Sequence, residues 1–230
     1  MDNPLEHALD RELLAFYQDE YAARGEEMYH WYKDYYIPQN IGLAPYNIAI
    51  ADFVMAHCPE LRFVEIGAGI GQISMLLATR RHHSSAVEAE ASEIFPMAQR
   101  AFARITEKVF LELPNYMTLI HDRFPNRAAT YVTPDSLICF PTLYEALSPE
   151  QEIRMLDVIA GASGVILSLR DFFRVRHSET ERDILVAQFR ARGFEAPIKL
   201  LDWESYSPDT TIYMKKPRPA RRSFWSRLRG

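Results

Sequence analysis

The residue pattern with the clearest chemical use is an apolar run that ends in an acid and three alternating glycines. It reads Phe63-Val64-Glu65-Ile66-Gly67-Ala68-Gly69-Ile70-Gly71. Alternating glycines let the backbone turn sharply and approach a ligand closely, and the N–H groups of a following helix then face the bound molecule. The next segment, residues 72–79, has apolar residues at helical spacing. The pattern therefore predicts a strand, a ligand-binding turn and a helix.

Two nearby positions narrow the kind of ligand. Gln72 stands where the dinucleotide-binding fingerprint has its last glycine, which speaks against a nicotinamide or flavin cofactor. Glu88 ends the next predicted strand, residues 85–88, about 20 residues after the glycines, where such domains place an acid for the ribose. A carboxylate there can accept hydrogen bonds from both ribose hydroxyls, and Glu90 is the alternative on the same stretch. These residues predict a nucleoside-binding site.

The pattern Glu-x-Gly-x-Gly-x-Gly after a first strand resembles motif I of the class I S-adenosylmethionine (SAM) methyltransferases. The resemblance extends to the order of the strands and helices over residues 61–214. It implies SAM as the cofactor. By the resemblance, Glu65 lies near the methionine amino end, and the turn of Gly67, Ala68, Gly69 and Gly71 passes under the cofactor.

The same resemblance gives roles to two later acids. It implies that Glu88 binds the ribose and that Asp122, just after a predicted strand at residues 117–121, contacts the adenine amino group. Asp122 can equally start a turn before Pro125, because an aspartate in that place is common loop chemistry. Both interpretations of Asp122 stay open.

Strand and helix patterns alternate along the chain, which predicts an α/β fold with a mostly parallel sheet covered by helices on both faces. The last two predicted strands are joined by a loop too short for a crossover helix, so they should pair antiparallel. The resemblance implies a Rossmann-like, seven-stranded sheet with the order 3-2-1-4-5-7-6. Beyond residue 121 the strands are expected at residues 136–140, 165–169, 198–201 and 210–214.

The N-terminal residues 1–60 form an extension before this domain. Helices are expected around residues 13–21 and 47–54, on either side of an aromatic block at residues 29–36. In methyltransferases that resemble this chain such an extension closes the site over the carboxyl ends of the strands, although aromatic residues also serve as ordinary core. The predicted organisation is a helical lid at 1–60, a SAM-binding domain at 61–214 and a basic tail at 215–230.

Methyl transfer needs an acceptor held in line and, for a hydroxyl, a base that removes its proton. The candidate bases are His30 from the extension, Tyr144 and Glu145 after the fourth strand, and Asp171 after the fifth. Residues 142–147 resemble a loop of the family in which a histidine often stands, but here Ala146 takes its place. The sequence favours O-methylation of a small polar acceptor such as a sugar; the alternatives are N-methylation of a small amine or protein, and a SAM-binding regulatory module without turnover.

Charge and composition limit the partners. The net charge is −5, yet seven of the 26 basic residues lie from Lys215 onward, so residues 1–214 carry −12. An acidic body speaks against nucleic acid as substrate. The cations of residues 170–177 can receive an anionic group on a small acceptor, or they can belong to a solvated loop that balances nearby acids. The tail mixes arginine with aromatic residues, as in contacts with an anionic membrane or a protein, and a solubilising tail is the alternative. The two cysteines have no paired spacing, so no disulfide or zinc site is expected. The absence of a signal-like start favours a cytoplasmic protein. The oligomeric state stays open.

Overall fold

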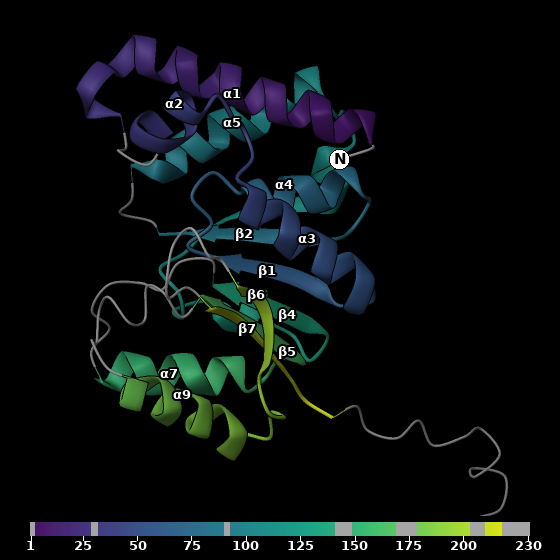
Figure 1. Cartoon of the computed structure of the whole chain (residues 1–230), viewed down its shortest axis with the longest axis vertical. Helices are drawn as coiled ribbons and strands as arrows, with labels where there is room; N and C mark the ends of the chain where they lie inside the picture. The colour runs from purple at the N-terminus through teal and green to yellow at the C-terminus, as the bar shows by residue number, and fades with distance from the viewer. Residues whose placement is uncertain are drawn as a thin grey trace, which may run out of the picture.

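The computed structural model describes residues 3–28, 32–89, 93–140, 149–168, 179–202 and 210–217. Its centre is a seven-stranded sheet with the order β3-β2-β1-β4-β5-β7-β6 (Figure 1). Strands β1 to β5 pair in parallel, and β7 pairs antiparallel with both β5 and β6. The strands are β1 (Arg62–Ile66), β2 (Ser84–Glu88), β3 (Met117–His121), β4 (Ser136–Phe140), β5 (Gly164–Ser168), β6 (Ile198–Asp202) and β7 (Thr210–Lys215). The predicted α/β fold with a mostly parallel sheet is confirmed.

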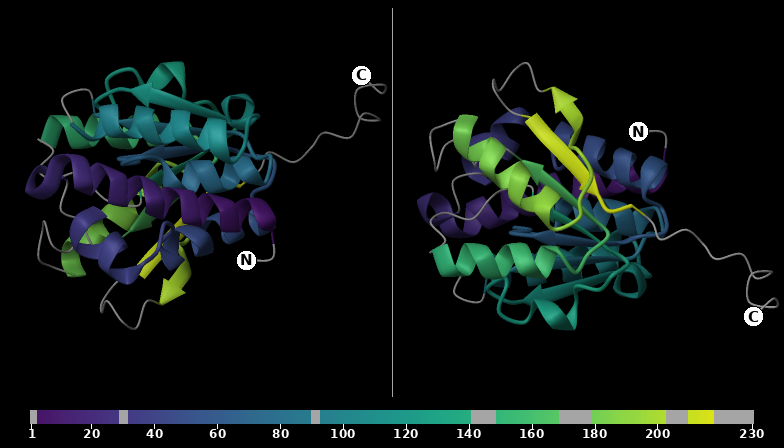
Figure 2. Two further views of the ribbon diagram at one scale, coloured as in Figure 1. Left: turned by 90° about the horizontal axis from the view of Figure 1, so that it is seen from above. Right: turned by 90° about the horizontal axis from the view of Figure 1, so that it is seen from below.

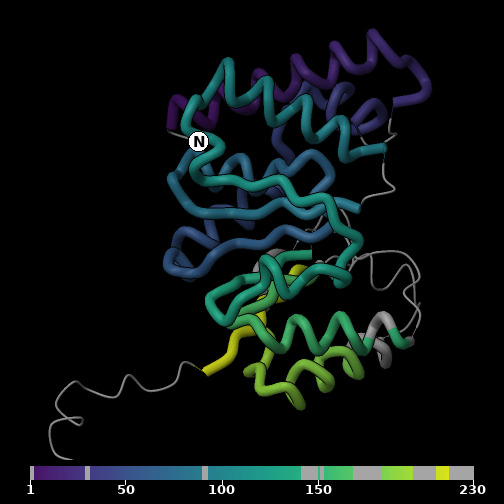
Figure 3. Tube along the Cα trace, turned by 180° about the vertical axis from the view of Figure 1, so that it is seen from behind, coloured from purple at the N-terminus to yellow at the C-terminus, as the bar shows by residue number. Residues whose placement is uncertain are grey.

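Helices cover both faces of the sheet, as the alternating pattern predicts (Figures 1 and 3). The helices α4 and α5 lie on one face with α1 and α3 packed against them, and α7 and α9 lie on the other face. The longer helices are α1 (Pro4–Arg24), α3 (Pro45–His57), α4 (Gln72–Thr79), α5 (Ile94–Lys108), α7 (Pro149–Ile159) and α9 (Glu179–Ala191). Short helical turns are η1 (Gly25–Glu27), η2 (Tyr32–Tyr36), α2 (Ile37–Gln39), α6 (Leu113–Tyr116) and η3 (Ala128–Thr130).

The central strands are apolar on both faces because each face is covered. Along β1, Phe63 joins the apolar cluster under α4 and α5, whereas Val64 and Ile66 join the cluster under α7 and α9. This continuous burial is typical of strands inside a parallel sheet. Glu65 interrupts the apolar run of β1 and is only 2% exposed.

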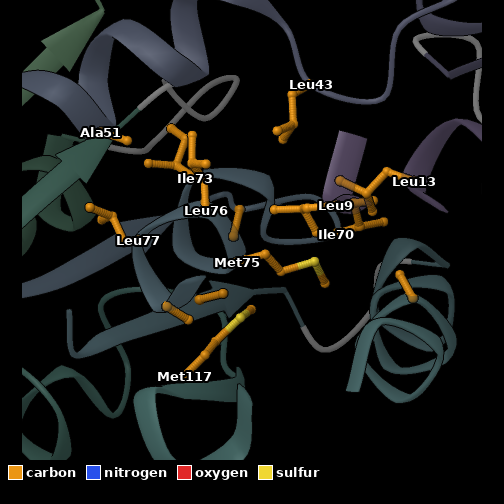
Figure 4. Packing of buried hydrophobic residues seen from close by; sticks show 14 of the residues in the cluster. Leu9, Leu13, Leu43, Ala51, Ile70, Ile73, Met75, Leu76, Leu77 and Met117 are labelled. Carbon is orange, nitrogen blue, oxygen red and sulfur yellow. The ribbon is translucent and has the colours of Figure 1, made fainter. Parts of the chain in front are cut away.

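The N-terminal extension shares the core of the sheet domain. Leu9 and Leu13 of α1 lie in one cluster with Ile70, Ile73 and other residues of the glycine turn and α4 (Figure 4). The helix α1 runs along the outside of α4 and α5 (Figure 2). Its polar face carries ion pairs to α5, between Arg104 and both Glu12 and Asp19 and between Arg100 and Glu20.

Within the extension, η2 contacts the glycine turn through Tyr32, and α3 contacts β7 through Phe53 and Tyr213. The boundaries predicted at residues 60 and 214 stay predictions, since one apolar cluster crosses residue 60. Within the described ranges, the chain contains no helix with the length and apolar character that crossing a membrane requires.

Candidate functional site

The glycine turn has the left-handed backbone that its composition predicts. Gly67, Gly69 and Gly71 have φ values of 67°, 57° and 83°, which side chains with a Cβ rarely adopt. Gly71 is the N-cap of α4, and its N–H donates to the carbonyl oxygen of Ala68 at 2.8 Å. The turn thus links the end of β1 directly to the first residue of α4.

Every backbone N–H from residue 67 to residue 71 already has an acceptor within the protein. Gly67 and Ala68 both donate to the carbonyl oxygen of Val87, at 3.0 and 3.2 Å. Gly69 donates to Oε2 of Glu88 at 2.8 Å, and Ile70 donates to the hydroxyl of Tyr32 at 3.2 Å. A phosphate at a helix N-terminus is bound by such N–H groups. This turn is therefore unsuited to a phosphate, because its N–H donors are engaged. The groups beside it are acceptors, the Glu88 carboxylate and the Tyr32 hydroxyl oxygen.

Glu65 is turned back toward the start of α4. Its Oε2 accepts hydrogen bonds from the backbone N–H of Ser74 at 3.0 Å and from the Ser74 hydroxyl at 2.6 Å. Burial raises the pKa of Glu65 to about 7, since a charged carboxylate is costly away from water. Its role at the methionine amino end of a cofactor stays a prediction.

Glu88 ends β2 and lies against the turn, as the sequence predicts for a nucleoside-binding acid. Its Oε2 accepts from Gly69, and its Oε1 accepts from the backbone N–H of Ala89 at 2.9 Å. The side chain is buried, and burial raises its pKa above the usual range. The rival acid Glu90 lies outside the described residues.

Two buried carboxylates thus lie near each other, and the charge of Glu88 also helps to raise the pKa of Glu65. In the described part of the chain, their recorded partners are backbone N–H groups, a serine hydroxyl and another acid, with no lysine, arginine or histidine among them. Uncompensated negative charge in a buried site favours a cationic ligand.

Asp122 directly follows β3, and its backbone N–H donates to the carbonyl oxygen of Glu88 at 2.9 Å. Its side chain is buried and organises the next turn: Oδ2 accepts from the Arg127 backbone N–H at 3.0 Å and from the Tyr131 hydroxyl at 2.7 Å. The turn-forming interpretation of Asp122 is thus observed, while the adenine contact stays a prediction. The backbone contact places Asp122 beside Glu88.

The four predicted bases, His30, Tyr144, Glu145 and Asp171, lie outside the described residues, as do the cations of residues 170–177. In the ranges that are described, no three His, Cys, Asp or Glu side chains gather as a metal site requires.

Sequence reasoning missed the polar cluster that joins the N-terminal extension to α4. Its centre is Gln72, whose Oε1 accepts from Tyr36 at 2.8 Å and from Asn47 at 2.6 Å. Its Nε2 donates to the Gly42 carbonyl oxygen at 2.9 Å and to the Tyr17 hydroxyl. A buried amide that uses all these groups fixes its neighbours firmly. The one signal in the sequence was a polar glutamine at the position where related turns need a glycine.

The comparisons with known proteins bear on the fold. No protein-family model and no curated protein matches this sequence. Among solved structures, the methyltransferase domain of the bacterial protein CtHen1-C matches with a TM-score of 0.58 at 11% identity, over 74% of this chain and 96% of that one. Magnesium protoporphyrin IX methyltransferase from Synechocystis PCC 6803, solved with bound SAM, matches with a TM-score of 0.57 at 13% identity, over 94% of this chain and 99% of its own.

The chain has the fold of the SAM-dependent methyltransferases. On this methyltransferase fold, the glycine turn, Glu88 and Asp122 follow three neighbouring parallel strands, β1, β2 and β3, at their carboxyl ends. Open α/β sheets bind their ligands at this edge. The structure therefore brings the predicted cofactor residues together at one edge of the sheet.

Proposed function

We propose that the protein is a SAM-dependent methyltransferase. The observation that carries the proposal is the pair of buried acids, Glu65 and Glu88, beside a glycine turn whose N–H groups are all engaged within the protein. SAM is a nucleoside without phosphates, and its sulfonium and ammonium groups are cationic. The cationic groups of such a ligand fit the negative charge of the two acids, and its ribose hydroxyls fit hydrogen-bond acceptors. A dinucleotide instead needs free N–H donors for its pyrophosphate.

In this proposal each residue has a simple task. Glu88 accepts the ribose hydroxyls, Glu65 supplies negative charge near the methionine amino end, and Asp122 lies toward the adenine. SAM supplies the electrophilic methyl group, so the protein mainly orients the acceptor and excludes water. The base that takes the acceptor proton is proposed among His30, Tyr144, Glu145 and Asp171.

Calorimetric titration with S-adenosylhomocysteine (SAH), the demethylated product, tests the cofactor site. We expect the wild type to bind SAH and Glu88→Gln to bind it about tenfold more weakly or worse, because a hydrogen bond to a charged acceptor contributes about 1.5–3 kcal/mol. Glu107→Gln removes an exposed acid of α5 and is the matched control, with unchanged affinity expected. Failure of the wild type to bind SAH or SAM would overturn the proposal.

The acceptor class is proposed as a small polar molecule, with O-methylation of a sugar or a related metabolite first. N-methylation and SAM binding without turnover are the alternatives from the sequence. Incubation with methyl-labelled SAM and fractions of small molecules, glycans, proteins and nucleic acids separates them by where the label goes. Label in a hydroxyl of a small molecule supports the first, and label in nucleic acid would contradict the expectation from the acidic body.

The basic tail is proposed to contact an anionic membrane or a protein. Deletion of residues 218–230 should then abolish co-sedimentation with anionic vesicles, or with the partner, while SAH binding stays unchanged. Equal sedimentation of the full chain and the deletion variant would leave the tail a solubilising segment.

A further inference from the structure

Tyr32, a residue of the N-terminal extension, lies directly on the glycine turn. Its side chain is buried, and its hydroxyl accepts a hydrogen bond from the Ile70 N–H at 3.2 Å. A Cβ added to Gly69 would lie 2.6 Å from the same hydroxyl oxygen. The closeness of the tyrosine is thus a second reason, besides the positive φ, why a glycine fits at position 69.

Tyr32 and Glu88 bind consecutive N–H groups of this turn. The Gly69 N–H donates to Glu88 and the Ile70 N–H donates to Tyr32. These two peptide groups flank the Cα of Gly69, where the backbone has the most freedom to rotate. Fixing the Ile70 peptide therefore also limits the orientation of the N–H that holds the Glu88 carboxylate.

The hydroxyl of Tyr32 is itself firmly placed. Its ring stacks on Tyr17, with centroids 5.1 Å apart and planes at 29°, and it packs against Tyr36 at 5.7 Å. The Tyr17 hydroxyl accepts a hydrogen bond from Nε2 of Gln72, the first residue of α4. These contacts tie the extension to Ile70 in the glycine turn and to Gln72 at the start of α4. Supporting residues hold a binding group in its productive geometry in this way.

We propose that Tyr32 is a positioning residue that orients Glu88 toward the ribose of the cofactor, acting through the Gly69–Ile70 peptide. The inference rests on the proposed cofactor. It gives the N-terminal extension a task at the nucleoside end of the site, separate from any contact with the acceptor.

The test is a double-mutant cycle measured by calorimetry with SAH and with 5′-methylthioadenosine, which keeps the nucleoside and lacks the amino acid. Tyr32→Phe keeps the ring and removes the hydroxyl; we expect about five- to tenfold weaker binding of both ligands, the usual effect of one lost hydrogen bond. In the Glu88→Gln background the same change should weaken binding less than about twofold, because residues that act as one unit are not additive.

Tyr36→Phe is the matched control. It keeps the ring that packs against Tyr32 and removes a hydroxyl that binds Gln72 rather than the glycine turn. We expect it to lower the melting temperature while SAH affinity stays within about twofold of the wild type, because its lost hydrogen bond lies outside the cofactor contacts. Equal weakening by Tyr36→Phe, or by Tyr32→Phe in both Glu88 backgrounds, would overturn the positioning role.

A measurement without ligand guards against a folding defect. Amide hydrogen exchange should show Ile70 and Gly69 protected in the wild type and in Tyr36→Phe, with both exchanging faster in Tyr32→Phe. Unchanged exchange at both positions would contradict the proposal. Absence of SAH binding by the wild type would instead refute the proposed cofactor, so the two failures are distinguishable.

Discussion

Replacing Gln72 by alanine should be among the most damaging changes to the stability of this chain. Gln72 is 6% exposed and makes four hydrogen bonds, to Tyr36, Asn47, Tyr17 and the Gly42 carbonyl. At about 1 kcal/mol for each net hydrogen bond, the change removes about 4 kcal/mol from the free energy of unfolding. Buried donors left without partners add to the loss. For a chain of this size, each kcal/mol lowers the melting temperature by about 2–4 °C, so we expect a drop of about 8–16 °C.

The assay is urea unfolding followed by circular dichroism, with Gln99→Ala as the control. Gln99 also lies in a helix, α5, but is exposed, and its loss should change the free energy of unfolding by less than about 0.5 kcal/mol. A loss below about 1.5 kcal/mol for Gln72→Ala, with an unchanged m value, would refute the reasoning that this cluster anchors the extension.

Three further predictions follow from single residues. Gly69→Ala should lower the free energy of unfolding in urea more than Gly25→Ala does. Both glycines have φ near 57°, but an added Cβ would meet the Tyr32 hydroxyl at Gly69 and no atom within 4 Å at Gly25. Equal losses of unfolding free energy would contradict the Tyr32 contact. Glu65 has its pKa raised to about 7, so it binds its proton more tightly in the folded chain, and its contribution to stability is lost as pH rises through 7. Between pH 5 and 8 the wild type should therefore lose about 2–3 kcal/mol more stability than Glu65→Gln, and parallel pH profiles would show that the pKa is not raised. Burial lowers the pKa of His82, so the folded chain holds the neutral ring and loses stability as pH falls below 6.5, where the unfolded chain binds the proton. His82→Gln should therefore flatten the profile of stability against pH in that range. An equally steep profile in both proteins would contradict this.

The parts of the fold that the sequence predicts well are those with strong local signals. The strand that contains Glu65 and the helix after Gly71 were predicted correctly, because an apolar run, alternating glycines and helical spacing all agree there. The antiparallel end of the sheet followed from the short loop before β7. The place of Glu88 at the end of β2 was predicted from its spacing after the glycines and from the resemblance to the methyltransferases.

The parts that sequence reasoning missed depend on contacts between distant segments. Tyr32 and Ile70 are 38 residues apart, and Tyr17 and Gln72 are 55 apart. An aromatic block predicts burial but does not say which hydroxyl meets which backbone group, since that is decided by how α1 and α3 pack on α4. The helix α1 was likewise longer than its apolar pattern indicated, because Asn3 caps it and Pro4 starts it.

The central claim is that the glycine turn and its two acids bind a cationic nucleoside and not a phosphate-bearing nucleotide. Calorimetric titration of the wild-type chain with SAM and, separately, with NAD⁺ tests it most directly. We expect micromolar binding of SAM and no measurable heat with NAD⁺, because the turn has no unengaged N–H from residue 67 to residue 71 for a pyrophosphate. Binding of NAD⁺ with no binding of SAM would contradict the claim.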